Sequence, residues 1–273
     1  LIFHIHQIIT GNKPFKHKFV EAICFYAYMG DAGITTNIYC GLSDFEEMTF
    51  LLHFLNRDDV FFDIGANVGA YTLLSSGICG SKSVAIEPIP TTFKRLEENV
   101  RLNQLENLVD CLNVGAGSEP SVLQFTNTNN SAMNRVVTGE NSSSLDKIKV
   151  RSIPLDQLKT RYPAPALMKI DVEGYEMHVL KGGADILMDN NLKAIIIELN
   201  QSGKAYGYSD EQISNFLESK GFFPNQYDPF SRRLSPLNGK NMKGFNTLFI
   251  RDKDKVQQRL KAAPSRKVLS IEF

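Results

Sequence analysis

Two acidic residues directly follow apolar runs, at a spacing that suits a nucleoside pocket. Asp63 lies in VFFDIGANVGAYTLL (60–74), where bulky apolar residues lead into a turn containing Gly65 and Gly69. Glu87 closes the next apolar run, SVAIEP, and follows Asp63 by 24 residues (87 − 63). A carboxylate at that point of a dinucleotide-binding fold accepts both hydroxyls of a ribose and disfavours a 2′-phosphate. The pair therefore predicts a ligand that contains a ribose.

The turn itself differs from one that binds a pyrophosphate. The dinucleotide fingerprint is G-x-G-x-x-G, and this chain has Asn67 in place of the second glycine and Ala70 in place of the third. The second glycine is the one that lets phosphate approach the backbone. A ribose without a pyrophosphate, beside an acid that suits a charged amino-acid tail, indicates S-adenosylmethionine. The alternatives are that Asp63 caps the turn and that Glu87 is a solvated strand end.

Charged residues in and after KIDVEG suit transfer of a methyl group to a hydroxyl. This transfer is an in-line displacement, so the protein must align the acceptor oxygen, exclude water and remove a proton. We expect Asp171 to orient the alcohol and accept its proton, with Glu173 next in rank and Lys169 beside them. The alternative is that Asp171 caps the following helix while Glu173 pairs with Lys169. Glu176 and His178 are expected behind the site or at the surface.

The apolar run KAIIIELN ends in polar groups that we expect to contact the acceptor. Glu198 and Asn200 would hydrogen-bond it, and Tyr206 would stack on a sugar ring. We expect the site to work without a metal. The alternative is Mg²⁺ held by Asp171, Glu198 and Asn200, which would lower the pKa of the acceptor hydroxyl.

The elements that position these residues alternate between strands and helices. Short apolar runs that stop at turns predict buried strands, and the spacing in 45–55, 69–77, 90–103 and 209–220 predicts helices. Nearly continuous apolar strands are typical of a mostly parallel sheet covered on both faces. We therefore predict an α/β, doubly wound, Rossmann-like fold, mostly parallel, with an antiparallel edge strand. The polar stretch 127–144 is predicted to be a mobile loop.

The composition disfavours some classes of partner and some compartments. Thirty basic and thirty acidic residues cancel, so we expect no nucleic-acid partner and no anionic membrane surface. No apolar run is long enough to span a bilayer. The four cysteines lie far apart without a C-x-x-C pair, which suits a reducing cytosol, and we expect a cytoplasmic protein without a signal peptide, from within a longer gene product.

One main domain is expected, at 45–253. A preceding extension, 1–44, is expected to face the substrate, and 254–273 is expected to be a C-terminal tail. Oligomeric state has no sequence signal.

The motifs, in their order along the chain, resemble those of the FkbM-type methyltransferases, which are class I S-adenosylmethionine-dependent O-methyltransferases. The similar segments are DIGANVGAYTLL, AIEP, PLDQL, MKIDVEGYEMHVLKGG and IIIELN. The resemblance covers roughly residues 45–200, with a weaker part to 250, and the KIDVEG-E-x-x-VL-x-G block is its most specific part. The chain departs from the family at Pro154, where Thr is common.

The resemblance implies cofactor contacts in three segments, one for each part of S-adenosylmethionine. They are Asp63, Gly65, Ala66, Asn67 and Gly69 for the methionine end, Glu87 and Pro88 for the ribose, and Asn113, Val114, Gly115 and Ala116 for the adenine. Family members methylate hydroxyls of sugars and secondary metabolites, so the resemblance implies transfer to oxygen.

The predicted function is therefore S-adenosylmethionine-dependent O-methylation of a sugar, glycan or secondary metabolite. The alternative from a different class is a catalytically silent cofactor-binding module in a biosynthetic complex, which predicts a broken carboxylate set at Asp171 and Glu173. N-methylation is disfavoured because no N-P-P-Y tetrad is present. A nicotinamide-dependent dehydrogenase is disfavoured by Asn67 and by the missing Tyr-x-x-x-Lys pair.

Overall fold

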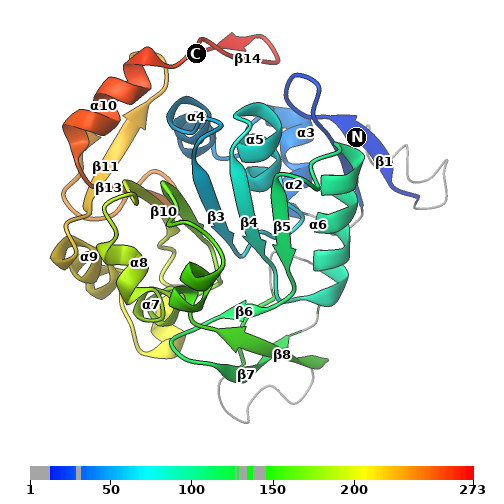
Figure 1. The fold of residues 1–273 in the computed structure, drawn as a ribbon, viewed down its shortest axis with the longest axis vertical. Coiled ribbons are helices and arrows are strands. Elements are labelled where there is room, and N and C mark those ends of the chain that lie inside the picture. Colours follow the sequence, from blue (N-terminus) through cyan, green and yellow to red (C-terminus); the bar gives the residue numbers. More distant parts are fainter. Residues whose placement is uncertain (1–12, 29–31, 127, 129–133, 138–145) are drawn as a thin grey trace.

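A computed structural model describes residues 13–28, 32–126, 128, 134–137 and 146–273, which are built around one large sheet (Figure 1). Its strands are β3 (Val60–Ile64), β4 (Lys82–Ile86), β5 (Val109–Leu112), β9 (Leu167–Ile170), β10 (Ala194–Glu198), β11 (Phe223–Asp228), β12 (Arg233–Pro236) and β13 (Asn246–Ile250). They lie in the order β12-β11-β13-β10-β9-β3-β4-β5. The five strands β10, β9, β3, β4 and β5 are parallel to one another.

The remaining elements flank this sheet. The helices are α2 (Ala32–Thr35), α3 (Asn37–Cys40), α4 (Phe45–Phe54), α5 (Ala70–Ile78), α6 (Pro90–Leu102), α7 (Glu176–Lys181), α8 (Ala184–Met188), α9 (Asp210–Ser219) and α10 (Lys253–Ala262), with 3₁₀ turns η2 (Leu155–Thr160) and η3 (Ser202–Tyr206). The smaller strands are β1 (Phe15–Lys18), β2 (Cys24–Ala27), β6 (Gly115–Ala116), β7 (Ser121–Thr126), β8 (Lys147–Ile153), β14 (Lys267–Val268) and β15 (Ile271–Glu272).

The predicted doubly wound, mostly parallel sheet is confirmed. Its edge strand β12 is antiparallel to β11, and β13 is also antiparallel, but it lies inside the sheet between β10 and β11. The predicted helices are present, with ends that differ by at most one residue. The apolar segment LVDCLNVGA contains two strands, β5 and β6, because the chain turns where Val114 N–H donates to Leu112 O.

Local signals explain where helices begin. Pro90 starts α6, where its missing N–H costs nothing and its fixed φ suits a helix. Ser209 caps α9 through a capping box: its side chain accepts from Gln212 N–H, and the Gln212 side chain accepts from Ser209 N–H. Such reciprocal bonds satisfy backbone donors that lack partners within the helix.

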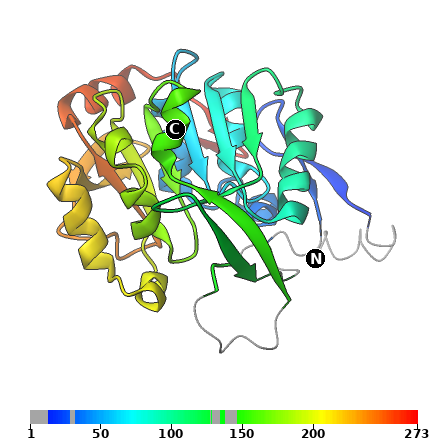
Figure 2. The same cartoon turned by 60° about the horizontal axis from the view of Figure 1, so that its bottom comes forward.

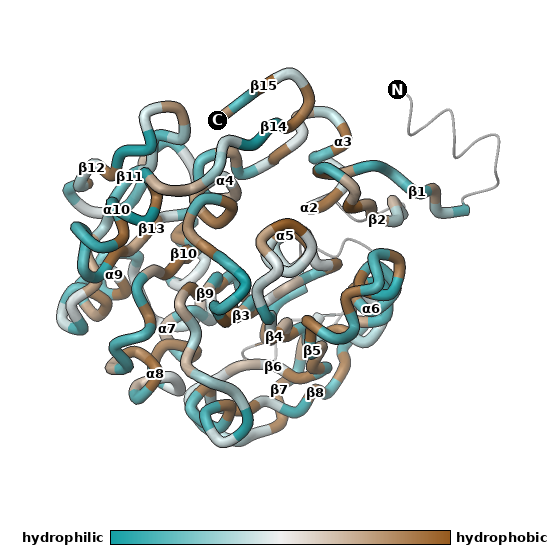
Figure 3. Tube along the Cα trace, turned by 45° about the horizontal axis from the view of Figure 1, so that its top comes forward, coloured by the Kyte–Doolittle hydropathy of each residue, from teal (hydrophilic) through white to brown (hydrophobic). Residues whose placement is uncertain are grey.

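The two faces of the sheet bury separate apolar cores. In β3, Phe61 packs with α4, α5, α6 and α10, whereas Phe62 and Ile64 pack with α7, α8 and α9. Successive strand residues point to opposite faces, so a sheet covered on both sides needs the continuous apolar runs seen in the sequence. Figure 3 shows brown, apolar segments toward the middle of the molecule and teal, hydrophilic ones in the outer loops.

The sheet register places four strand ends at one level. Ile64 pairs with both Ile86 and Ile170, and Ile170 pairs with Ile197. The residues that follow these isoleucines therefore leave the sheet at the same edge. The strand order reverses between β3 and β9, and open α/β sheets bind ligands outside the carboxyl ends at such a switch point.

Both flanking segments add to the main domain. The β1–β2 hairpin is tied to α6, because Asn103 accepts from Cys24 N–H at 2.8 Å and donates to Cys24 O at 2.7 Å. Val256 and Leu260 of α10 lie in the core that contains α4. The boundaries at 44 and 254 remain predictions. No helix within the described ranges is long and apolar enough to cross a bilayer.

A small sheet, β6-β8-β7, projects from the main one beneath the carboxyl ends of the parallel strands (Figures 1 and 2). It carries residues 134–137, since Val136 bridges Phe125 of β7. The rest of the stretch predicted to be a mobile loop lies largely outside the described residues.

Candidate active site

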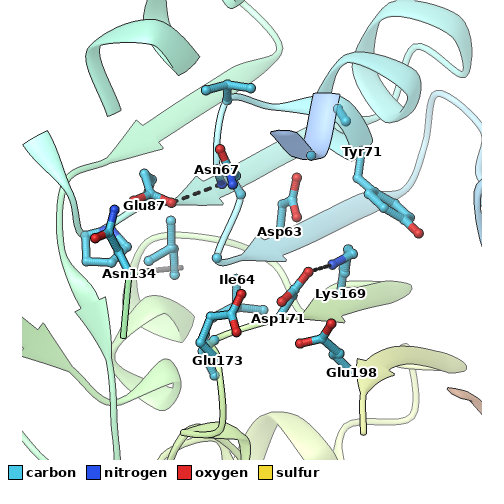
Figure 4. A pocket seen from close by; sticks show the side chains of 18 of the residues that line it. Asp63, Ile64, Asn67, Tyr71, Glu87, Asn134, Lys169, Asp171, Glu173 and Glu198 are labelled. Carbon is cyan, nitrogen blue, oxygen red and sulfur yellow. Dashed lines mark hydrogen bonds and ion pairs between the residues drawn. The ribbon is translucent and has the colours of Figure 1, made fainter. Parts of the chain in front are cut away.

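A pocket opens at the switch point between β3 and β9, with side chains converging on it from several strand ends (Figure 4). Its open space is about 1170 Å³, part of it shared with solvent, which is ample for a small-molecule ligand. The predicted site residues that line it are Asp63, Gly65, Ala66, Asn67, Glu87, Pro88, Gly115, Ala116, Lys169, Asp171, Glu173 and Glu198. Those that do not line it are Gly69, Asn113, Val114, Asn200 and Tyr206.

The glycine turn joins the two sides of the pocket. Gly65 has a φ of 81°, and a Cβ there would lie 1.8 Å from the carbonyl oxygen of Asp171. Gly69 has a φ of 97°, and a Cβ there would lie 2.7 Å from Leu96 on α6. The close approaches that require glycine are thus to the chain itself, and Gly69 packs against a helix instead of facing a ligand.

Asp63 is buried behind the turn, with a side chain that is only 1% exposed. Its carboxylate accepts a 2.6 Å hydrogen bond from the hydroxyl of Thr72, in the first turn of α5, and the backbone of Thr72 also hydrogen-bonds to it. Burial raises its pKa to about 6, although nearby Lys169 opposes that shift. A buried acid that lines a pocket and is held by one partner keeps acceptor capacity for a ligand.

Glu87 is buried as well, and both of its oxygens receive backbone N–H groups. Oε2 accepts from Asn67 at 3.0 Å and Oε1 accepts from Ile89 at 2.9 Å. Burial raises its pKa to about 7, and these two hydrogen bonds oppose the shift. Glu87 is therefore not a solvated strand end, but a fixed acceptor that lines the pocket and has lone pairs left for a ligand (Figure 4).

The segment after β5 supports the pocket from two directions. Exposed Asn113 donates to Glu87 O at 2.9 Å and to Pro88 O at 3.1 Å, which holds the end of β4 in place. Val114 packs against the second core, and Gly115 and Ala116 reach the pocket.

An apolar wall encloses the end of the pocket near Glu87. It consists of Ile89, Phe125 and Val136, with exposed fractions of 2%, 6% and 7%. They form a cluster with Val150, packed beside Tyr175 and Tyr206. An apolar wall of this kind beside a buried carboxylate could cover an aromatic base.

On the opposite side of the pocket, Lys169 and Asp171 form a close ion pair. The Lys169 ammonium lies 2.6 Å from Oδ2 of Asp171 and 4.9 Å from the ring centre of Tyr71. Burial disfavours the charged form of this lysine, but Asp171, Asp44 and Asp63 outweigh that effect and raise its pKa. The expected alternative, a pair between Lys169 and Glu173, is not what the structure contains.

Three carboxylates converge beside this pair. One oxygen each of Asp171, Glu173 and Glu198 lies within 4.8 Å of the other two. Burial first, and then the charge of Asp171, raises the pKa of Glu173 to about 7 and that of Glu198 to about 9. The chain takes a left-handed turn at Glu173, with φ 54°, to bring it there.

A divalent cation, if bound, could use Glu173 together with the expected Asp171 and Glu198. The third expected ligand, Asn200, donates its amide nitrogen to Glu198 at 3.0 Å and accepts the N–H of Ser202 through its oxygen. The hydroxyl of Tyr206 donates to the carbonyl of Val136. Neither Asn200 nor Tyr206 lines the pocket.

Glu176 was expected behind the site or at the surface, and it is buried. It is 1% exposed, and Oε1 accepts the N–H of Gly174 at 3.0 Å and of Val172 at 3.3 Å. Glu176, not Asp171, closes the turn that begins the next helix. Its role is thus to shape the loop that presents Asp171 and Glu173.

Several pocket residues have no sequence signal. Asp44, Tyr71, Asn134, Val136 and Tyr175 line the pocket, although they come from separate elements without a common motif. Tyr71 donates to Asp44 at 2.9 Å. Gly33, Ile34 and Ser43, which precede α4, also line the pocket.

Comparison with known proteins gives a consistent assignment. Residues 63–224, more than half of the chain, match the family model described as the methyltransferase FkbM domain. The chain is 32% identical over 155 residues to the hexuronic acid methyltransferase AglP of Haloferax volcanii, a match that spans 55% of this chain and 59% of AglP. It is 28% identical over 190 residues to methyltransferase 1 of Beauveria bassiana, which spans 60% of this chain and 73% of that protein.

Among solved structures, the methyltransferase FkbM of Methylobacillus flagellatus is similar with a TM-score of 0.49 and 15% identity. That superposition covers 80% of this chain and 52% of the other.

Proposed function

We propose that this chain, which belongs to the FkbM methyltransferase family, is an S-adenosylmethionine-dependent O-methyltransferase that acts on a sugar, glycan or secondary-metabolite hydroxyl. The observation that carries the proposal is the joining of two unlike halves in one pocket. The cofactor half is formed by Asp63, Glu87 and the apolar wall. The acceptor half is formed by the Lys169–Asp171 pair and its two neighbouring glutamates.

The residues of the cofactor half fit the cofactor. The buried Oδ1 of Asn67 has no hydrogen-bond partner among the described residues, so it is open to a donor from a ligand. Glu87 would accept the ribose hydroxyls, Asp63 would attract the cationic amino-acid end, and the wall would cover the adenine. S-adenosylmethionine, when bound, supplies a methyl group activated by a sulfonium charge.

In the acceptor half, Asp171 would orient the hydroxyl and take its proton. Lys169 holds the Asp171 carboxylate in one direction at 2.6 Å, which fixes the geometry that an in-line displacement requires. An alcohol oxygen becomes acidic as it is alkylated, so an ordinary carboxylate suffices as the base. Glu173, with a pKa raised to about 7, is suited to pass the proton on near neutral pH.

The charges in this half favour an uncharged acceptor. Lys169 is the one Lys or Arg among the described residues that line the pocket, and its ammonium is committed to Asp171. The segments outside the described residues contain neither Lys nor Arg. An acceptor carboxylate would thus meet no uncommitted Lys or Arg among the described lining residues, although the charge of Arg135, outside the lining, acts on Glu173. Hydroxyls can hydrogen-bond both Glu173 and Glu198.

The test is mass spectrometry of acceptors incubated with the protein and S-adenosylmethionine. Methyl glucoside and methyl glucuronoside are matched probes, because they differ in a hydroxymethyl against a carboxylate. We expect a gain of one methyl group on neutral polyols and little on uronates. AglP is named for a hexuronic acid, which is an acidic substrate and so opposes this expectation. Transfer to methyl glucuronoside alone would refute an uncharged acceptor.

The silent-module alternative is tested by binding. Both hypotheses expect S-adenosylhomocysteine to raise the melting temperature, but only an enzyme transfers the methyl group. The assembled Asp171, Glu173 and Lys169 support the enzyme. Stabilisation by NAD⁺ and not by S-adenosylhomocysteine would overturn both.

A further inference from the structure

Tyr206 connects the two halves of the pocket without lining it. It is the last residue of η3, which follows β10 on the acceptor side. A Cβ on Gly174 would lie 2.7 Å from Cε2 of Tyr206, so the tyrosine ring rests on the backbone of the turn that presents Glu173. Its hydroxyl donates at 2.7 Å to the carbonyl of Val136, in the wall of the cofactor side.

The wall segment, residues 134–137, is also anchored on the side of β7. Val137 N–H donates to Gln124 O at 2.7 Å, and Thr126 N–H donates to Arg135 O at 3.0 Å. The side chain of Asn134 is held separately, because its Oδ1 accepts the N–H of Thr128 at 2.7 Å. Among the described residues, the Tyr206 hydroxyl supplies the one hydrogen bond to this segment from the acceptor half.

The hydrogen bond from Tyr206 to Val136 affects the pocket because alternate residues of the wall segment face it. Asn134 and Val136 line the pocket, whereas Arg135 between them is exposed. Fixing the carbonyl of Val136 therefore fixes the direction of the Val136 side chain, whereas Asn134 is held by Thr128. Burial raises the pKa of Tyr206 to about 12, so its hydroxyl remains a donor at every pH at which the protein would be assayed.

We propose that Tyr206 is a positioning residue for the cofactor: its hydroxyl holds Val136 against the nucleoside end of the pocket. This inference rests on the proposed function, because it takes the nucleoside to be that of S-adenosylmethionine. It replaces the expected role of Tyr206 as a platform for the acceptor sugar.

The experiment compares Tyr206→Phe with Tyr208→Phe. The Tyr208 hydroxyl accepts from Lys181 at the exposed surface and the residue does not line the pocket, so it is a matched loss of one phenolic oxygen. Calorimetry with S-adenosylhomocysteine should give about three- to tenfold weaker binding for Tyr206→Phe, as one neutral hydrogen bond implies. Tyr208→Phe should bind as the wild type does, and both variants should melt at similar temperatures.

Two further measurements separate positioning from a general loss of structure. The amide of Val137 should exchange its hydrogen faster in Tyr206→Phe than in Tyr208→Phe, without ligand. Val136→Ala should also weaken binding, and its effect should combine with Tyr206→Phe to less than the product of the two, since both act on one wall.

The outcomes are distinct. If the wild type fails to bind S-adenosylhomocysteine, the proposed function fails. If the wild type binds and Tyr206→Phe binds equally well, or if Val136→Ala has no effect, the role of Tyr206 is wrong. The role of Tyr206 would also be refuted if Tyr206→Phe and Tyr208→Phe lost the same affinity for S-adenosylhomocysteine and had equally lowered melting temperatures.

Discussion

The buried acids in the two halves of the pocket have different neighbours. In the cofactor half, Thr72 donates to Asp63, and two backbone N–H groups donate to Glu87. In the acceptor half, Asp171, Glu173 and Glu198 face one another, and a single ammonium, Lys169, serves the first of them. Hydrogen bonds to a carboxylate stabilise its charge, whereas neighbouring carboxylates destabilise it.

This difference indicates different tasks. The cofactor half has its polar groups arranged before any ligand arrives, which lowers the cost of binding. In the acceptor half, burial and neighbouring carboxylates raise the pKa of Glu173 to about 7 and that of Glu198 to about 9, so these groups hold protons near neutral pH and can exchange hydrogen bonds with an incoming polyol. A pocket of this kind binds the cofactor in a fixed position, and it places the carboxyl groups that destabilise one another beside the group that reacts.

The largest expected effect comes from breaking the junction of the two halves. In Gly65→Ala, the new Cβ would meet the carbonyl of Asp171 at 1.8 Å, in a backbone conformation with φ 81°. Because that carbonyl belongs to the sheet edge and cannot withdraw, we expect a loss of about 4 kcal/mol or failure to fold. Denaturant unfolding measures the loss.

Gly207→Ala is its control. Gly207 has a φ of 86°, but nothing lies within 4 Å of its Cβ position. It should cost only the left-handed conformation, about 1 kcal/mol. Equal losses in the two variants would mean that the contact between Gly65 and Asp171 contributes nothing, and that the halves are not joined there.

The next effect separates the halves by function. Asp171→Asn keeps a hydrogen-bond acceptor for Lys169 but removes the charge and the base, so we expect turnover to fall about 10²- to 10³-fold. Affinity for S-adenosylhomocysteine should change less than about threefold, because the cofactor half is untouched. Steady-state kinetics and calorimetry measure the two. A large loss of affinity with turnover preserved would reverse the assignment of the halves.

The cofactor half was largely predictable from the sequence, and local continuity is the reason. Asp63, Gly65 and Asn67 lie in one turn, and Glu87 follows the next strand, so parallel pairing alone places them together. The same reasoning placed Asp171 and Glu198 at that edge, since the register aligns Ile64, Ile170 and Ile197.

The acceptor half was less predictable because it depends on side-chain directions. Glu173 joins the carboxylate cluster through a left-handed turn at its own position, which spacing does not reveal. Asn200 has a suitable position in the sequence, but its amide serves Glu198 and Ser202. Glu176 looks like a surface acid on a helix, and only the fold shows that it closes the preceding turn. Tyr206 acts through a carbonyl 70 residues away in the chain (206 − 136).

A smaller effect tests the electrostatic strain of the acceptor half. The pKa of Glu198 is raised from 4.5 to about 9, so the folded state holds its proton more tightly than the unfolded state does. Its stabilising contribution is present below about pH 4.5 and is lost as the pH rises toward 9. Glu198→Gln has no proton to lose at this position. Its free energy of unfolding should therefore rise relative to that of the wild type as the pH rises from 5 to 9.

Glu198 is only partly buried and solvent screens part of the effect, so we expect a relative gain of about 1 kcal/mol across that range. Urea unfolding at several pH values measures it. Glu211→Gln, at an exposed position of α9, is the control. Its free energy of unfolding should depend on pH as that of the wild type does. A parallel curve for Glu198→Gln as well would mean that the three carboxylates do not strain one another.

The smallest expected effect concerns metal. Asp171, Glu173 and Glu198 are near enough to one another to hold a divalent cation, but Lys169 already places a positive charge 2.6 Å from Asp171. A cation in the cluster would have to displace that ammonium or share Asp171 with it, at a Coulombic cost. We therefore expect turnover measured with EDTA to stay within about twofold of turnover with Mg²⁺. Loss of activity in EDTA that Mg²⁺ restores would show instead that the acceptor half is completed by a metal ion, and that Lys169 turns away from Asp171 when the ion binds.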